Sequence, residues 1–541
     1  MTDSVSQLTR YNAKRNELIT ADRAARVDHL RASLSPVEQE ADQIIRKIRD
    51  LEANSIWTAD HPSIPHPFPG MEFLTGRNII VQTKLFEILT KMPKGALLHA
   101  HLDGTVNVKF LLKLAVKQPA IHVRATERLR SQNLTSVLPE FKALSQNEYP
   151  EAQNLVGLTD ESYQPGSWVP IQKARELFGL ELGGPEGFDR WVTRWLTIEP
   201  SEAYGTHNTS TKIWSKFQST FIVAAPLVRY EPILAEYIRE FFLSSIADGI
   251  SYVEPRVNFM YKFIIAADGR QDIPHRQLVA IFDRVLHDVK EEMKHKGREG
   301  EFIGARIIYT TVRFCDNEEL EWYLRDCIAL KKEFPHLIAG FDLVGHEDVL
   351  KPLIYYAETL LRFPQMQKEA GVEIPFIFHA GETLGDGTMA DMNLYDAILL
   401  GTKRIGHGFS LVKHPRLMEI CKERDIAVEV CPISNEILRL TSSMSTHPLP
   451  ILLNNGIHVA LCSDDPSVFG NMGLTFDYFQ VLAASELTGL IQLGEMAKDS
   501  IKYSTLKTLE KDKALALWHK QWEKFLEYVI TTGREHLTSQ A

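Results

Sequence analysis

From about residue 94 onward, short apolar runs alternate with amphipathic segments at helical spacing. Runs such as 302–310 are almost uninterrupted by polar residues, which is typical of strands buried on both faces of a parallel sheet. Segments such as 318–332 have the spacing of the intervening helices. The eight runs, with the polar residues that follow them, cover 95–104, 250–257, 302–310, 338–348, 374–382, 404–408, 427–434 and 458–466. Eight strand–helix units predict an α/β fold with a (β/α)₈ TIM barrel.

Two other stretches differ from this pattern. Residues 1–90 are predicted to form an N-terminal helical extension, with a helical pattern over 21–51 and a helix start at Pro36. Residues 91–541 are predicted to form the barrel. Within it, periodicity weakens over about 118–212, which is far longer than an ordinary barrel connection. We interpret this stretch as an insertion in the first βα loop, which lies over the active face of such a barrel.

Polar clusters follow several of the predicted strands, and a barrel brings strand ends together. An H-x-H pair, His99 and His101, ends the first run, and alternation along a strand points both imidazoles to one side. His379 ends the fifth run and Asp464 the eighth. Three imidazoles and one carboxylate suit Zn²⁺ with one position left for water, so the sequence predicts one zinc ion per subunit.

Three further residues near these ligands have both catalytic and structural interpretations. Glu382 is three residues after His379 and could donate a proton to a substrate nitrogen, or cap the next helix. His407 could accept or orient the proton of the attacking water, or be a packed core histidine. Asp465 could accept or orient the proton of the attacking water, bind substrate, or cap a helix that begins at Pro466. Taken together, the set predicts metal-assisted hydrolysis.

Composition and charge exclude several classes of protein. The net charge of −10 and the absence of a basic tract with aromatics argue against nucleic-acid binding. No apolar run approaches a membrane span, and the polar N-terminus lacks the core of a signal peptide. The five cysteines are odd in number and widely spaced, which favours a reduced, cytoplasmic protein. Secretion by a non-classical route is the alternative.

The motifs, in their order along the chain, resemble the adenosine and AMP deaminase group of the amidohydrolase barrels. The finer resemblance is to the adenosine deaminase-related growth factor subfamily, and it covers about residues 90–525. The motifs that carry it are H-A-H-L-D-G, V-G-H-E-D, H-A-G-E-T, R-I-G-H-G-F, V-C-P-I-S-N and S-D-D-P, with M-P-K-G at 92–95, W-S-K-F at 214–217 and S-I-K-Y-S at 500–504.

This resemblance implies that adenosine, and 2′-deoxyadenosine, react with water to give inosine-type products and ammonia in purine catabolism and salvage. It assigns zinc to the four ligands named above, protonation of purine N1 to Glu382 and orientation of the hydroxide to His407. The implied substrate contacts are Asp465 with N7, the amide of Gly345 with N3 and Asp103 with the ribose. It also implies nucleoside contacts for Trp214 and His346.

The resemblance leaves alternatives open. An AMP deaminase would need cations for the 5′-phosphate, and the acidic Asp103 argues against one. A modified adenosine as substrate and a growth-factor-like binding protein are the other readings, although a binding protein would not need the complete ligand set. The insertion contains no cysteine, unlike that of secreted members. The expected partners are a small nucleoside substrate and a second copy of the chain, with which the N-terminal extension would form a homodimer.

Overall fold

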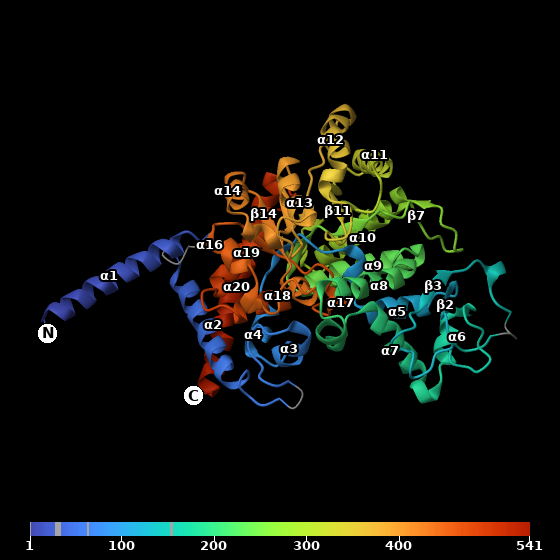
Figure 1. Cartoon of the computed structure of the whole chain (residues 1–541), viewed down its shortest axis with the longest axis horizontal. Coiled ribbons are helices and arrows are strands. Elements are labelled where there is room, and N and C mark those ends of the chain that lie inside the picture. The colour runs from blue at the N-terminus through green and yellow to red at the C-terminus, as the bar shows by residue number, and fades with distance from the viewer. Residues whose placement is uncertain (1, 27–33, 62–63, 152–154, 541) are drawn as a thin grey trace.

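The structure is a computed structural model and describes residues 2–26, 34–61, 64–151 and 155–540. Figure 1 shows a central body of strands and surrounding helices, from which helix α1 (Thr2–Ala24) projects at one end. A smaller lobe lies at the opposite end. Within the described residues, no helix combines the length and the hydropathy that are required to cross a bilayer.

The strands of the central body follow the predicted runs. Each pairs in parallel with its neighbours, as the βαβ connections require. Their bounds are β1 (Gly95–Leu97), β5 (Ile250–Val253), β6 (Arg256–Asn258), β9 (Gly304–Ala305), β10 (Ile307–Val312), β11 (Ile338–Val344), β12 (Phe378–Ala380), β13 (Arg404–His407), β14 (Ala427–Val430) and β15 (Val459–Leu461). The second strand is divided at Pro255, which has no N–H to donate to the ladder.

The pairing passes around the body and returns to the first strand. The ladders form the parallel sheets β1-β5-β9, β6-β10-β11 and β12-β13-β14-β15. Isolated parallel bridges link these sheets at three places, which are His101 with Arg256, Phe341 with Phe376, and Ala100 with Asp464. Because β5 continues into β6 and β9 into β10, eight strand segments form a closed circuit. The predicted barrel is confirmed.

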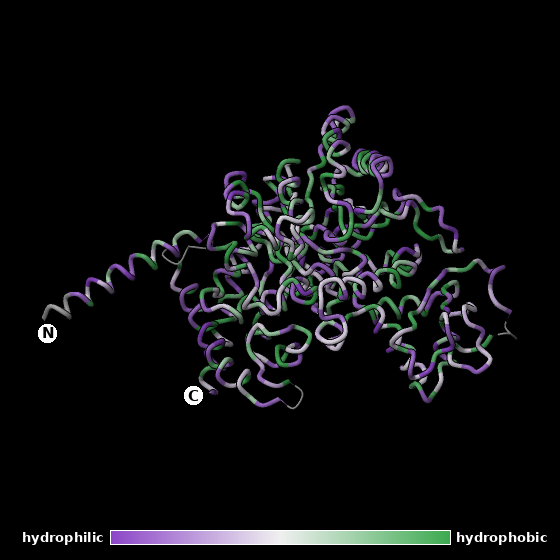
Figure 2. The backbone as a smooth tube through the Cα atoms, viewed as in Figure 1, coloured by the Kyte–Doolittle hydropathy of each residue, from purple (hydrophilic) through white to green (hydrophobic). Residues whose placement is uncertain are grey.

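Helices cover the outside of this circuit. Figure 2 shows hydrophilic residues along outer helices such as α11, while hydrophobic positions concentrate toward the centre. The bounds are α5 (Val108–Val116), α8 (Ser210–Val228), α9 (Glu231–Ala247), α10 (His275–His295), α11 (Asn317–Glu333), α12 (Ala357–Ala370), α13 (Met389–Leu399), α14 (Pro415–Glu423), α15 (Pro432–Ile437), α16 (Leu449–Asn454), α17 (Pro466–Phe469), α18 (Thr475–Ala483), α19 (Leu490–Lys502) and α20 (Thr508–Ser539).

The N-terminal stretch contains α2 (Pro36–Ser55), α3 (Phe73–Ile80) and α4 (Lys84–Leu89). Helix α2 begins at Pro36 as predicted, where Ser35 and Glu38 form a capping box. Its buried face packs on α20 and α19, so it is attached to the barrel. Residues 27–33 of the predicted helical pattern lie outside the described residues. A separate domain over 1–90 and its role in dimerisation stay predictions.

The stretch between α5 and α8 forms the smaller lobe of Figure 1. Its elements are β2 (Ile121–Arg124), β3 (Glu140–Ala143), β4 (Val169–Pro170), α6 (Ile171–Glu176) and α7 (Gly184–Leu196). The strands form an antiparallel sheet in the order β3-β2-β4. Helix α7 packs on α5 and α8 and thereby joins the lobe to the barrel. A short hairpin of β7 (Phe263–Ile264) and β8 (Ile273–Pro274) lies elsewhere, between β6 and α10.

Candidate metal centre and active site

Four of the predicted residues meet at the carboxyl ends of the barrel strands. His99 and His101 follow β1, His379 lies in β12, and Asp464 follows β15. One potential ligand atom from each of the four lies within 4.8 Å of the others. Asp464 Oδ1 is 3.4 Å from His99 Nε2 and 3.3 Å from His101 Nε2. The structure therefore brings the predicted metal ligands together.

The chemistry of these atoms fits a bound cation. His99 Nε2 and Asp464 Oδ1 are buried and have no hydrogen-bond partner among the described residues, although buried polar atoms are normally paired. Burial, together with the nearby His99 and Arg256, lowers the pKa of His379 well below its usual value and keeps its imidazole neutral. Burial opposes ionisation of Asp464, but the His101 and His99 imidazoles hold its pKa well below the usual range. Neutral imidazoles and an ionised carboxylate are the ligands that zinc prefers.

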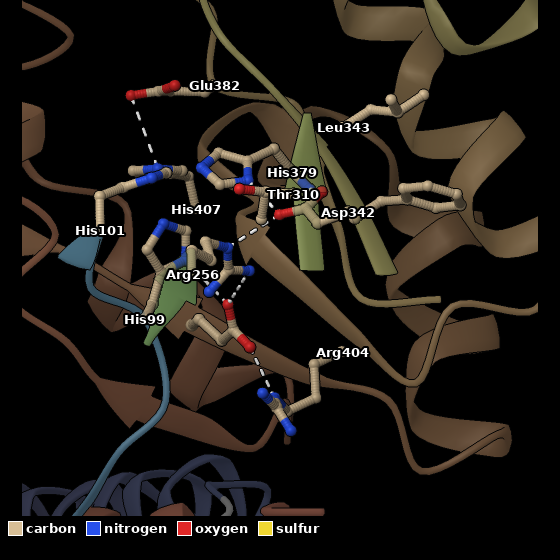
Figure 3. A network of polar contacts seen from close by, with 12 residues as sticks. His99, His101, Arg256, Thr310, Asp342, Leu343, His379, Glu382, Arg404 and His407 are labelled. Carbon is tan, nitrogen blue, oxygen red and sulfur yellow. Dashed lines mark hydrogen bonds and ion pairs between the residues drawn. The ribbon is translucent and has the colours of Figure 1, made fainter. Parts of the chain in front are cut away.

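Two buried carboxylates orient the ligand imidazoles, as Figure 3 shows for Asp342 and His379. Asp342 Oδ2 lies 2.6 Å from His379 Nδ1, and Glu429 Oε2 lies 2.8 Å from His99 Nδ1. Each carboxylate fixes the tautomer of its histidine, so that Nε2 is unprotonated and faces the centre. Arg256 joins the two carboxylates through contacts of 2.8 Å to each.

Sequence reasoning missed this supporting network. Arg404 extends it, with contacts of 2.5 Å to Glu429 and 2.7 Å to Glu254. All these side chains are buried, and although burial opposes ionisation, Arg256 and Arg404 hold the pKa of Glu429 well below its usual value. The available signal was a single charged residue inside an otherwise apolar strand, as Glu429 is in β14 and Asp342 in β11.

Glu382 and His407 lie beside the four ligands. Figure 3 marks the contact of 3.7 Å between His407 Nε2 and Glu382 Oε1. Glu382 does not cap the following helix, because Thr388 caps α13. Its Oε1 is buried and has no hydrogen-bond partner among the residues that the structure describes, and burial, with Asp464 and Glu347 nearby, raises its pKa well above the usual value. A carboxyl that holds its proton near neutrality can act as an acid.

Two of these residues have an unusual backbone. His407 and Asp464 both have φ of 59°, in the left-handed region that side chains rarely adopt. Such conformations cost about 1–3 kcal/mol each and cluster at functional sites, where the fold holds a side chain in place. Gly406 supports the same arrangement, since a Cβ there would lie 3.0 Å from His99 Cε1.

A cavity of about 300 Å³ opens beside these residues. The predicted substrate-binding residues Asp103, Trp214, Gly345 and Asp465 line it, together with His101, His379, Glu382, His407 and Asp464. Apolar side chains complete the wall, among them Phe217, Phe221, Met260, Phe314 and Leu350. Its lining contains no lysine or arginine among the described residues. His346 does not line the cavity; its ring stacks on Trp214 with centroids 4.4 Å apart.

Asp465 and Gly345 are held in place by local structure. Asp465 precedes Pro466 at the start of α17, as predicted, but its side chain makes no capping hydrogen bond. Its Oδ1 is buried and finds no hydrogen-bond partner within the described part of the chain, and burial beside Asp464 and Asp103 raises its pKa well above the usual value. Gly345 has φ of 107°, and a Cβ there would lie 2.7 Å from Leu350 Cδ1. Only glycine fits this position without strain.

Comparison with known proteins gives consistent matches over most of the chain. Residues 197–520 match the family model described as adenosine deaminase, and residues 1–89 match the model of the adenosine/AMP deaminase N-terminal region. Adenosine deaminase 2 of Homo sapiens is 31% identical over 465 residues, which cover 86% of this chain and 84% of the relative. Adenosine deaminase 2-A of Danio rerio is 33% identical over 460 residues, which cover 85% and 84%.

Solved structures agree on the fold. The adenine deaminase of Arthrobacter aurescens superposes with a TM-score of 0.52 at 18% identity, over 80% of this chain and 99% of that one. A zinc-bound amidohydrolase from Burkhoderia ambifaria has a TM-score of 0.51 at 16% identity, over 86% and 98%. By its family match and by its relatives, the chain belongs to the adenosine deaminase family.

Proposed function

We propose that the protein is a zinc-dependent hydrolase that deaminates adenosine and 2′-deoxyadenosine, in purine nucleoside catabolism and salvage. The observation that carries the proposal is the convergence of three imidazoles and one carboxylate on a cavity that also holds Glu382. Two buried atoms of this set have no hydrogen-bond partner among the described residues. The names of the relatives support adenosine as substrate, and the zinc-bound amidohydrolase supports the choice of metal.

The reaction replaces the 6-amino group of the purine. A water oxygen bonds to C6 while Glu382 gives a proton to N1, and the C6–N6 bond then breaks. Of the two protons of the water, one replaces the proton that Glu382 gave to N1 and the other converts the leaving amino group into ammonia. Zinc, when bound by the four ligands, would act as a Lewis acid and lower the pKa of the attacking water. The raised pKa of Glu382 leaves a proton on this carboxyl to give to N1. His407 Nε2 faces the same space and holds the attacking oxygen.

The remaining predicted residues would recognise the nucleoside. The Asp465 carboxyl, whose pKa is raised, can donate a hydrogen bond to N7. The Gly345 amide would donate to N3, and Asp103 would meet the ribose hydroxyls. Trp214 supplies a flat apolar wall, and His346 acts through its stacking on that ring.

The cavity favours a nucleoside over a nucleotide. A 5′-phosphate needs charge-assisted donors, and its lining offers no lysine or arginine among the described residues. Asp103 would repel the phosphate in addition. We therefore place adenosine ahead of AMP and of 5′-phosphorylated derivatives.

We also propose a cytoplasmic location and a homodimer. All five cysteines are buried and free, which is typical of a reducing compartment. Helix α1, whose residues 7–24 are almost all exposed, projects from the body and could pair with a second copy of the chain (Figure 1). Cell fractionation tests the location, and mass photometry of the intact protein tests the homodimer.

The substrate is tested by absorbance at about 265 nm, where deamination of adenosine lowers the signal. We expect purified, zinc-loaded protein to convert adenosine rapidly and AMP at most slowly, because no lysine or arginine of the described residues lines the cavity to bind a phosphate. Preference for AMP would overturn the substrate, and no reaction with either would overturn the proposed function.

The proton donor and the metal are tested by two variants. Glu382→Gln is expected to retain zinc and to lose about 10²–10⁴-fold in kcat, because the amide cannot protonate N1. Asp464→Ala is expected to lower the zinc content of the purified protein, measured by atomic emission. Unchanged kcat in the first variant, or full zinc occupancy in the second, would remove that residue from its role.

A further inference from the structure

A chain of hydrogen bonds connects His407 to a second buried histidine outside the cavity. Asn435 Nδ2 lies 3.3 Å from His407 Nδ1, and Asn435 Oδ1 lies 3.1 Å from His447 Nε2. The chain ends at the backbone N–H of Leu449, which donates to His447 Nδ1 at 3.0 Å. Asn435, His407 and His447 are all buried, with exposed fractions of 0%, 2% and 4%.

The backbone sets the direction of every bond in this chain. The N–H of Leu449 can only donate, so His447 Nδ1 carries no proton. The proton of neutral His447 is then on Nε2, from which it is donated to Asn435 Oδ1. The amide of Asn435 is thereby oriented with Nδ2 toward His407, and Nδ2 can only donate. His407 Nδ1 must accept, which leaves the proton of the neutral ring on Nε2.

The surroundings of His407 Nε2 agree with this assignment. Two carboxyl oxygens lie near it, Glu382 Oε1 at 3.7 Å and Asp464 Oδ2 at 4.0 Å. The other end of this series of hydrogen bonds is also fixed by the backbone. Leu449 is the first residue of α16, and its N–H is one of the donors that a helix leaves without an intrahelical partner. Burial lowers the pKa of His447 to about 3, which is consistent with its neutral form.

We propose that Asn435 and His447 are positioning residues that fix His407 in the tautomer with its proton on Nε2. His407 then donates a hydrogen bond to the attacking oxygen and does not remove a proton from it. The inference rests on the proposed function only for its consequence in catalysis. The arrangement of protons along the chain follows from the fold alone.

Nitrogen NMR of the zinc-loaded protein labelled with ¹⁵N-histidine tests the tautomer directly. Long-range ¹H–¹⁵N spectra distinguish a protonated from an unprotonated ring nitrogen, and the spectrum of His407→Ala assigns the signals. We expect a proton on Nε2 of His407 and none on Nδ1. His447→Leu, which removes the donor to Asn435, is expected to yield a mixture of tautomers, whereas His447→Gln keeps a donor near the former Nε2 and should retain the wild-type pattern.

Two further variants distinguish a change in tautomer from a general loss of structure. Asn435→Asp has nearly the same shape but only accepts, so it is expected to draw the His407 proton to Nδ1. His122→Leu removes another fully buried histidine, which lies in β2 of the lobe, and should leave His407 unchanged. Thermal midpoints identify any variant that is not folded.

Kinetics with adenosine supply the catalytic test. His447→Leu is expected to lose about 10–100-fold in kcat with KM within about threefold, and His447→Gln to recover most of the loss. A proton on Nδ1 in the wild-type protein, or an unchanged tautomer in His447→Leu, would overturn the proposal. The NMR result does not depend on turnover. A protein that is inactive on adenosine would therefore refute the proposed function, while the NMR spectra alone would decide the tautomer assignment.

Discussion

Replacing Glu429 by glutamine removes one negative charge from the buried network behind the ligand histidines. Glu429 contacts His99 at 2.8 Å, Arg256 at 2.8 Å and Arg404 at 2.5 Å, and its side chain is fully buried. Glutamine keeps the shape but turns an N–H₂ donor toward side chains that are themselves donors. The variant therefore leaves guanidinium charge uncompensated in a medium of low polarity.

The size of the expected loss in unfolding free energy follows from the burial of the Glu429 ion pairs. Breaking a buried ion pair costs about 3–5 kcal/mol of unfolding free energy, which for a chain of this length corresponds to a fall in Tm of about 3–5 °C. Glu140→Gln is the matched control. Its partner Arg124 is 2.7 Å away, but the two side chains are 34% and 37% exposed. Because exposed pairs contribute about 0–1 kcal/mol, the control should lower Tm by about 1 °C or less.

The assay is thermal unfolding of zinc-loaded and metal-free protein, combined with a competition titration for zinc. We also expect Glu429→Gln to weaken zinc binding about 10–100-fold, because His99 loses the carboxylate that fixes its tautomer. A fall in Tm no larger than that of Glu140→Gln, together with unchanged zinc affinity, would refute the reasoning that burial of this network stabilises both the fold and the metal centre.

Three other predictions follow from local features. Burial raises the pKa of Glu52 to about 7, so the folded state binds this proton more tightly than the unfolded chain does, and stability is lost as pH rises from 5 to 8. Glu52→Gln, which keeps an acceptor for the Lys84 N–H, should reduce that loss by up to about 3 kcal/mol; an identical fall in Tm over this range would contradict the assignment. Gly104→Ala would place a Cβ 2.0 Å from Asp465 Oδ1 and should raise KM for adenosine by about tenfold or more, whereas an unchanged KM would exclude Asp465 from substrate binding. Chelation should abolish turnover and lower Tm, since a ligand at 100 times its Kd stabilises by about 2.7 kcal/mol, and restoration by zinc is the control.

The sequence by itself determined the barrel and the residues at its centre. Continuous apolar runs report burial on both faces, and such strands occur in parallel sheets that helices cover. Strand ends are local features of the chain, so polar residues such as His99, His379 and Asp464 could be assigned to one site once eight units had been counted. Helix starts were equally local, as at Pro36, where Ser35 caps α2.

Only the tertiary structure decided which buried charges meet and where protons lie. Arg256 joins Asp342 and Glu429, which are 86 and 173 positions away, and hydrophobic periodicity carries no information about such partners. The placement of His346 behind Trp214, outside the cavity, and the tautomer of His407 depend in the same way on distant segments. A sequence pattern reports whether a side chain is buried, but closure of the barrel determines which donor faces which acceptor.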